Sequence, residues 1–125
     1  MNLDSPPLHN WPRMAQTVDE AAAGLHTQYG EKGIPSDVLK REIECIGGYG
    51  RDSVIPSDYC YNVINRAAYS FRHWVLVRVG WGRYKYVGPD DAFTGPILWK
   101  PKQEAERQVG RWSDGVCRLD FDPRV

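Results

Sequence analysis

The sequence lacks long apolar segments, and its first residues are not expected to act as a secretory leader. No run approaches the about 18 consecutive apolar residues that a membrane-spanning helix needs. The first residues, M-N-L-D-S-P-P-L-H-N-W-P-R-M, lack the basic start and apolar core of a signal peptide. We therefore expect a globular, soluble chain without a membrane partner, located in the cytoplasm.

Cysteine and histidine are scarce. The cysteines are odd in number and widely spaced, which argues against a disulfide framework and against a CxxC metal site. We expect them to be reduced and buried; they are Cys45, Cys60 and Cys117. The histidines lack the partner spacing of a zinc site or of a nucleophile and its base; they are His9, His26 and His73.

Phosphate-binding loops are also missing. The stretch G-G-Y-G has no following Lys-Ser or Lys-Thr, and G-W-G-R belongs to a hairpin turn, not to a strand-to-helix turn. A thiol mechanism would need Cys60 or Cys117 beside His73 with a lowered pKa, and nothing in the sequence shows that they are close together. The sequence therefore favours a non-catalytic protein, with no catalytic residue, no cofactor and no metal expected, and an enzyme remains the least supported alternative.

The formal net charge is zero, because 16 basic side chains balance 16 acidic ones among the 125 residues. This balance argues against binding nucleic acid through overall charge. The charges are unevenly distributed, however: residues 66–102 contain seven cations and two anions, so this segment carries +5 and the rest carries −5. Such a segment forms either a solvated face or a local positive field that attracts anions.

A chain of this length suffices for one domain with a single core. Residues 1–16 include a proline-rich entry and are expected to form a loose arm. Residues 17–37 are expected to add a helix and a linker, because Thr17 and Glu20 have capping-box spacing and Gly30 is placed to end the helix. Residues 38–121 are expected to form a single α+β domain.

The tetrad I-P-S-D occurs twice, at residues 34–37 and 55–58, and both copies have the chemistry of a helix start. The serine oxygen can accept early backbone N–H groups, and the aspartate favours the helix dipole. The first copy predicts a helix that ends at Gly47-Gly48. The second predicts a helix through Y-C-Y-N-V-I-N-R-A-A, whose polar face carries Asp58, Tyr61, Asn62, Asn65 and Arg66.

After residue 72 the pattern becomes alternating. The runs W-V-L-V-R-V and R-Y-K-Y-V, joined at Gly80-Trp81-Gly82, predict a β-hairpin. Along its second arm Arg83 and Lys85 point one way and the tyrosines point the other, so one face is basic.

A short strand at residues 97–99 and a second hairpin from 108–112 and 116–121 are expected to follow. The predicted fold class is therefore α+β, with two or three N-terminal helices followed by an antiparallel sheet built from hairpins, winged-helix-like in part.

Four stretches together resemble a small uncharacterised domain that recurs in bacterial and phage-borne proteins. They are I-G-G-Y-G-R-D-S-V-I-P-S-D-Y-C-Y-N, G-W-G-R-Y-K-Y-V-G, T-G-P-I-L-W-K-P-K and V-G-R-W-S-D-G, and the resemblance covers residues 38–115. It implies domain limits and no activity. The G-x-G-R-Y hairpin also resembles the wing of winged-helix modules in restriction and transcription proteins, where a helix before the wing enters the major groove of DNA.

This geometry leads to the first functional hypothesis, a binding module that contacts double-stranded DNA through a helix and a basic hairpin. Asn62, Asn65 and Arg66 would reach base edges or phosphates from the helix, because asparagine and arginine can make bidentate contacts. The hairpin would hold the DNA backbone with Arg78, Arg83 and Lys85. Alternatively, the asparagines bond nearby backbone and the arginines are solvated or ion-paired.

The competing hypothesis is a protein-interaction or self-assembly module of a mobile or phage-related element, without nucleic acid. Five tryptophans are many for this length, and Trp81 sits in a turn where burial is difficult. Exposed Trp, Tyr and Arg side chains carry much of the energy of protein interfaces. We expect Trp81 and Tyr61 to be the interaction residues, and a homo-oligomer is the expected assembly.

Overall fold

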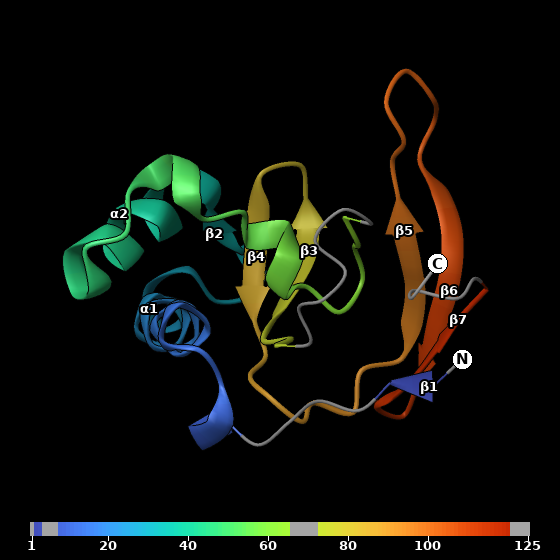
Figure 1. The fold of residues 1–125 in the computed structure, drawn as a ribbon, viewed down its shortest axis with the longest axis horizontal. Coiled ribbons are helices and arrows are strands. Elements are labelled where there is room, and N and C mark those ends of the chain that lie inside the picture. Colours follow the sequence, from blue (N-terminus) through green and yellow to red (C-terminus); the bar gives the residue numbers. More distant parts are fainter. Residues whose placement is uncertain (1, 4–7, 66–72, 121–125) are drawn as a thin grey trace.

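The computed structural model describes residues 2–3, 8–65 and 73–120, and its ribbon is drawn in Figure 1. Over these residues the chain forms two helices and two small antiparallel sheets, which confirms the predicted α+β class. The helices are α1, Arg13–Tyr29, and α2, Ser36–Gly47. Within the described residues, neither helix has the length and apolar character needed to cross a bilayer. The 3-10 turns span Leu8–Asn10, Gly30–Lys32, Arg51–Ser53 and Pro56–Tyr59.

The two sheets lie side by side, with the helices next to the first of them (Figure 1). We call the first the helix-side sheet; its strand order is β2-β4-β3, with bounds Ile34–Pro35, Arg83–Tyr86 and Leu76–Gly80. The second is the C-terminal sheet; its strand order is β1-β7-β6-β5, with bounds Asn2–Leu3, Val116–Leu119, Arg107–Ser113 and Gly95–Trp99. Both predicted hairpins are confirmed, as β3–β4 and β6–β7.

A short extended segment, residues 60–64, joins the two sheets; we call it the linking strip. On one edge it forms a parallel bridge between Cys60 and Leu76 of β3, and on the other a parallel bridge between Val63 and Leu98 of β5. The Tyr61 amide donates to the Leu76 carbonyl at 2.8 Å, and the Leu98 amide donates to the Asn62 carbonyl at 2.9 Å. Backbone hydrogen bonds therefore run from one sheet to the other through this strip.

The linking strip corrects the prediction of a helix after the second I-P-S-D tetrad. The tetrad forms only one 3-10 turn, Pro56–Tyr59, before the chain becomes extended. Residues 60–65 are Cys, Tyr, Asn, Val, Ile and Asn, which are all poor helix formers. The aromatic and β-branched ones among them fit a pleated strand well. The first tetrad does lead into a helix, α2, which ends as predicted at a left-handed Gly48.

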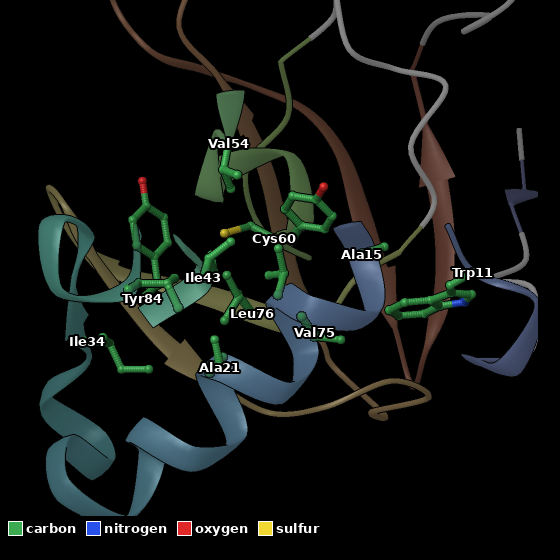
Figure 2. Packing of buried hydrophobic residues seen from close by; sticks show 14 residues of the cluster. Trp11, Ala15, Ala21, Ile34, Ile43, Val54, Cys60, Val75, Leu76 and Tyr84 are labelled. Carbon is green, nitrogen blue, oxygen red and sulfur yellow. The ribbon is translucent and has the colours of Figure 1, made fainter. Parts of the chain in front are cut away.

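The larger core lies between the helices and the helix-side sheet. Figure 2 shows its side chains converging from α1, α2, the sheet and the linking strip. Val18 and Ala22 of α1, Leu39 and Ile43 of α2 and Leu76 of β3 are all completely or almost completely buried. Because α1 contributes this much apolar surface, it is an integral layer of the fold.

Within residues 1–16, which are expected to form a loose arm, the described residues 2–3 and 8–16 make contacts with the rest of the fold. Trp11 is 3% exposed and packs in the larger core (Figure 2), and β1 pairs with β7. Helix α1 begins at Arg13, one turn before the predicted start, so Thr17 lies inside it. The Thr17 hydroxyl donates to the Arg13 carbonyl at 3.0 Å, which replaces the predicted capping role. The predicted end at Gly30 is confirmed, with a φ of 55°.

A second, smaller core belongs to the C-terminal sheet and contains Tyr61, Trp112 and Cys117, all 3% exposed or less. The Trp112 indole donates to the Tyr61 carbonyl at 2.7 Å, which anchors the linking strip on this sheet. All three cysteines are free, as predicted. Cys60 and Cys117 are buried in separate cores, whereas Cys45 is exposed on α2, which corrects the prediction that all three are buried.

Candidate functional site

The β3–β4 hairpin has the two faces that its sequence predicts. Tyr84 and Tyr86 pack toward the helices, and the Tyr86 hydroxyl donates to the Asp19 carboxylate of α1 at 2.9 Å. Arg83 and Lys85 lie on the opposite face. Lys85 forms an ion pair with Glu31 at 2.7 Å, so one of the two predicted cations of this face is compensated.

Trp81 stands at the tip of this hairpin and is 73% exposed. The Arg78 guanidinium lies over one face of its indole ring, 4.4 Å from the ring centroid. A ring that is covered on one face and still nearly three-quarters exposed must present its other face to solvent. The prediction of an exposed Trp81 is thus confirmed, and the structure adds the arginine beneath it.

Arg78 is held from two directions. Its guanidinium makes two hydrogen bonds to the Glu106 carboxylate, at 2.7 and 2.9 Å, across the space between the two sheets. Its backbone N–H and C=O both bond the side-chain amide of Asn62, each at 2.8 Å. The hydrogen bonds with Arg78 lower the pKa of Glu106, and those with Glu106 raise the pKa of Arg78.

A groove of about 310 Å³ opens between Trp81 and the C-terminal sheet. The turn of β3–β4 and the loop between β5 and β6 project from the same end of the molecule (Figure 1). Trp81 and Trp99 come from opposite sides of the groove, and Arg78, Lys100 and Glu106 supply its charges. Trp99 also has an arginine over its ring, Arg107 at 5.0 Å.

A second hollow, of about 540 Å³, lies between Trp81 and the start of α2. Its cations are Lys40, Arg51 and Arg83, and its anions are Asp37 and Asp52. It forms because the Ser36 amide donates to the Gly82 carbonyl at 2.8 Å, which ties the start of α2 to the hairpin turn.

Trp81 therefore separates two charged hollows. We call this surface the Trp81 ridge; it comprises Trp81 and the flanking cations Lys40, Arg51, Arg83, Arg78 and Lys100.

Of the residues predicted to bind DNA, Arg78 and Arg83 belong to this ridge, and Asn62 and Asn65 lie next to it. Their arrangement differs from the predicted helix and hairpin. Asn62 is not on a helix, and its amide is used by the Arg78 backbone. Asn65 follows the linking strip and lines the groove. Arg83 lines the second hollow, with one guanidinium N–H donating to the Gly33 carbonyl at 3.3 Å. Arg66 lies outside the described residues.

Tyr61 does not have the predicted exposed position. It is 3% exposed, and its hydroxyl donates to the Gly88 carbonyl at 2.9 Å and accepts from the Asp91 amide at 3.2 Å. Because the strip is extended, its side chain points into the smaller core. Tyr61 is therefore a structural residue.

Four members of the site are not indicated as site residues by any motif in the sequence: Lys40, Arg51, Trp99 and Glu106. Lys40 and Arg51 lie outside the basic segment 66–102, and only the pairing of β2 with β4 brings them to the hairpin tip. The one available signal was the repeated tetrad, which placed a helix start just before Lys40.

Besides Arg78 and Glu106, two partly or fully buried groups near the ridge have shifted pKa values. Burial raises the pKa of Asp58 to about 6, and its Oδ1 atom has no hydrogen-bond partner among the described residues. Burial also raises the pKa of the Cys60 thiol, whose Sγ lies 3.6 Å from the Pro56 carbonyl oxygen. Among the described residues, no group of three or more His, Cys, Asp or Glu side chains is placed to hold a metal ion.

These features define a small α+β domain with an aromatic, cation-flanked ridge at one end. The chain matches the family described as Domain of unknown function (DUF7225) over residues 17–119, and it belongs to that family. It is similar to a Bacillus subtilis (strain 168) protein named "Uncharacterized protein YnaC", with 36% identity over 96 residues. The match covers 76% of this chain and 36% of that relative, so the chain spans little more than a third of the relative's length. No solved structure matches.

The family match includes α1, in agreement with the burial of that helix in the larger core. It supports the resemblance to a small uncharacterised bacterial domain. Neither comparison assigns a ligand to the domain.

Proposed function

We propose that this domain is a non-catalytic binding module that holds nucleic acid along the Trp81 ridge. The observation that carries the proposal is the 73% exposed Trp81 with cation-lined hollows on both of its sides. Aromatic rings interleaved with cations are the combination that binds bases and phosphates together.

The charges of the ridge favour an anionic ligand. Five cations line the two hollows against three carboxylates, and one carboxylate, Glu106, is already paired with Arg78. Lys40, Arg51, Arg83 and Lys100 therefore face two acids, Asp37 and Asp52. This excess gives a local positive field on a protein whose net charge is zero.

The proposed contact differs from helix-based recognition of DNA. Base reading by a helix has no support at Asn62, because both hydrogen-bonding groups of its amide are occupied by Arg78. Phosphate contacts from the cations remain, and these give affinity without sequence preference. We therefore expect binding that depends on salt and weakly on sequence.

The test is fluorescence anisotropy of labelled oligonucleotides, duplex and single-stranded, titrated with the full chain over a series of salt concentrations. The double variant Lys40→Ala, Arg83→Ala should bind more weakly and reduce the slope of log K against log salt by about 1.5. The matched control is Lys32→Ala, Arg41→Ala, which removes two exposed cations from neighbouring positions that do not line either hollow. Equal slopes for the two double variants would contradict the proposal.

The second candidate is a protein-binding or self-assembling module. It is favoured by the exposed apolar surface of the same hairpin, where Val79 is 45% exposed near Trp81. Sedimentation at several protein concentrations tests this candidate. A dimer that dissociates in Trp81→Ser and Val79→Ser, combined with no salt-sensitive binding of either oligonucleotide, would favour it over nucleic acid.

A further inference from the structure

We infer that Trp81 is a stacking platform for an unpaired base, so that the ligand of the ridge is single-stranded nucleic acid; this inference rests on the proposed function. Two facts carry it. Arg78 covers one face of the indole at 4.4 Å, and the ring is nevertheless 73% exposed. The open face has the size and character that a base requires for stacking.

The indole ring is held in place before any ligand arrives. Arg78 is fixed by its paired bonds to Glu106 and by the two Asn62 bonds to its backbone. A guanidinium fixed in this way supports the ring from below through a cation–π contact. A base on the solvent-exposed face would complete a stack of guanidinium, indole and base. Because the ring is already held in place, binding would cost little side-chain conformational entropy.

The cations on the two sides of Trp81 are placed to contact the phosphates of a single strand that crosses the hairpin tip. Arg51 and Arg83 line the hollow on one side of Trp81, and Lys100 lines the groove on the other. A strand crossing the hairpin tip would place one base on Trp81 and its neighbouring phosphates beside these cations. Trp99 on the far side of the groove offers a second aromatic ring to the same strand.

A duplex meets the ridge differently. Each base within a duplex is already stacked on both faces, so the indole could reach one only after unstacking it, which costs free energy. A duplex can therefore use the cations and not the open face of Trp81. Stacking at Trp81 should accordingly give preference to a single strand over the duplex of the same sequence.

The experiment compares Trp81→Ala, Trp81→Leu and Trp81→Phe in the full chain, with Val79→Ala as the control for an exposed apolar side chain of the same hairpin. The probes are a labelled oligothymidylate, an abasic strand of equal length and a duplex. We expect Trp81→Ala and Trp81→Leu to weaken oligothymidylate binding about 5- to 100-fold. Trp81→Phe should retain most of the affinity, and the abasic strand and the duplex should respond little to any of the three.

Three results overturn the inference. If Trp81→Leu binds oligothymidylate like the parent, Trp81 does not act by stacking. If Trp81→Ala weakens duplex and single strand equally, the preference for an unpaired base is wrong. In both cases the proposed nucleic-acid function would still be supported if the double variant Lys40→Ala, Arg83→Ala had a smaller slope of log K against log salt than the parent. If none of the three probes binds in a salt-sensitive way, the proposed function fails and the inference fails with it.

Discussion

The side-chain amide of Asn62 pairs with the backbone of Arg78 as a neighbouring strand would. The Asn62 Nδ2 donates to the Arg78 carbonyl and its Oδ1 accepts from the Arg78 amide, both at 2.8 Å. The linking strip thereby continues its pairing with β3 beyond the Cys60–Leu76 bridge. Asn62 thus supports the arginine that underlies Trp81, instead of contacting a ligand itself.

Replacing Asn62 with alanine should destabilise the fold. The substitution leaves a donor and an acceptor of the Arg78 backbone without their partner in a partly buried place, which costs about 1 to 3 kcal/mol. Urea unfolding at neutral pH measures the free-energy change, and Gln28→Ala, at an exposed position of α1, is the control. A loss of stability no greater than that of the control would show that water replaces the amide without cost.

The Arg78–Glu106 ion pair should stabilise the fold at neutral pH and stop doing so in acid. The pKa of Glu106 is lowered by its hydrogen bonds with Arg78, so the stabilisation is complete above its ordinary pKa of 4.5 and is lost as the pH falls through the lowered value. A double-mutant cycle with Arg78→Gln and Glu106→Gln should give a coupling of about 1 kcal/mol at pH 7.

The Lys85–Glu31 pair is the matched comparison for this cycle, because its glutamate side chain is 82% exposed, against 20% for Glu106. A cycle on Lys85 and Glu31 should give a smaller coupling that salt screens more readily. If the coupling free energy of Lys85–Glu31 were as large as that of Arg78–Glu106, burial and bidentate hydrogen bonding would not be what strengthens the Arg78–Glu106 pair.

Asp58 should produce the opposite dependence on pH. Burial raises its pKa from 3.8 to about 6, so the folded state binds a proton more tightly than the unfolded state does. Stability should therefore fall as the pH rises from about 4 to about 6 and stay lowered above that range. Asp58→Asn should remove this dependence and raise the stability at pH 7 by about 1 to 2 kcal/mol.

The first tetrad supplies the control for Asp58. Asp37 occupies the same place in its I-P-S-D tetrad but is exposed. Thermal unfolding between pH 4 and pH 7 should therefore show a gain in stability at pH 7 for Asp58→Asn relative to the parent, and no such gain for Asp37→Asn, which removes a carboxylate from the first turn of α2. Parallel profiles for all three proteins would show that Asp58 carries no buried charge.

Gly110 should not tolerate alanine. A Cβ at this position would lie 2.5 Å from the Arg118 carbonyl oxygen and 3.0 Å from the Leu119 Cδ2, so β6 and β7 would have to separate. We expect a loss of about 2 kcal/mol or more in chemical unfolding. Gly80 is the matched control, because nothing lies within 4 Å of a Cβ there. Equal tolerance at both positions would contradict this account.

Local patterns in the sequence were sufficient for most regular elements. Alternation and turn glycines predicted β3–β4 and β6–β7, and left-handed glycines predicted the ends of α1 and α2. The helix at the second tetrad failed because a helix-start motif says nothing about the residues beyond it. After the first tetrad come good helix formers such as Leu39 and Lys40; after the second come Tyr61 and Val63, which favour extended chain.

The candidate site was only partly accessible from sequence. Exposure of Trp81 followed from its place in a tight turn, and the basic face of β4 followed from strand alternation. The pairing of Arg78 with Glu106 and the arrival of Lys40 beside the hairpin depend on contacts between distant segments. Such contacts are set by how the two sheets and α2 pack together, which no local pattern encodes.

The linking strip has a consequence for how the molecule melts. Each sheet is small, and sheets of this size have little independent stability; the strip's backbone bonds reach both of them. If one sheet unfolded, the other sheet would lose the linking strip as a hydrogen-bonded neighbour. The two sheets should therefore unfold in a single cooperative step. Cys60 is buried in the larger core and Cys117 in the smaller one, so their reactivity reports on the unfolding of each core. Both thiols should become reactive toward an alkylating reagent at the same denaturant concentration.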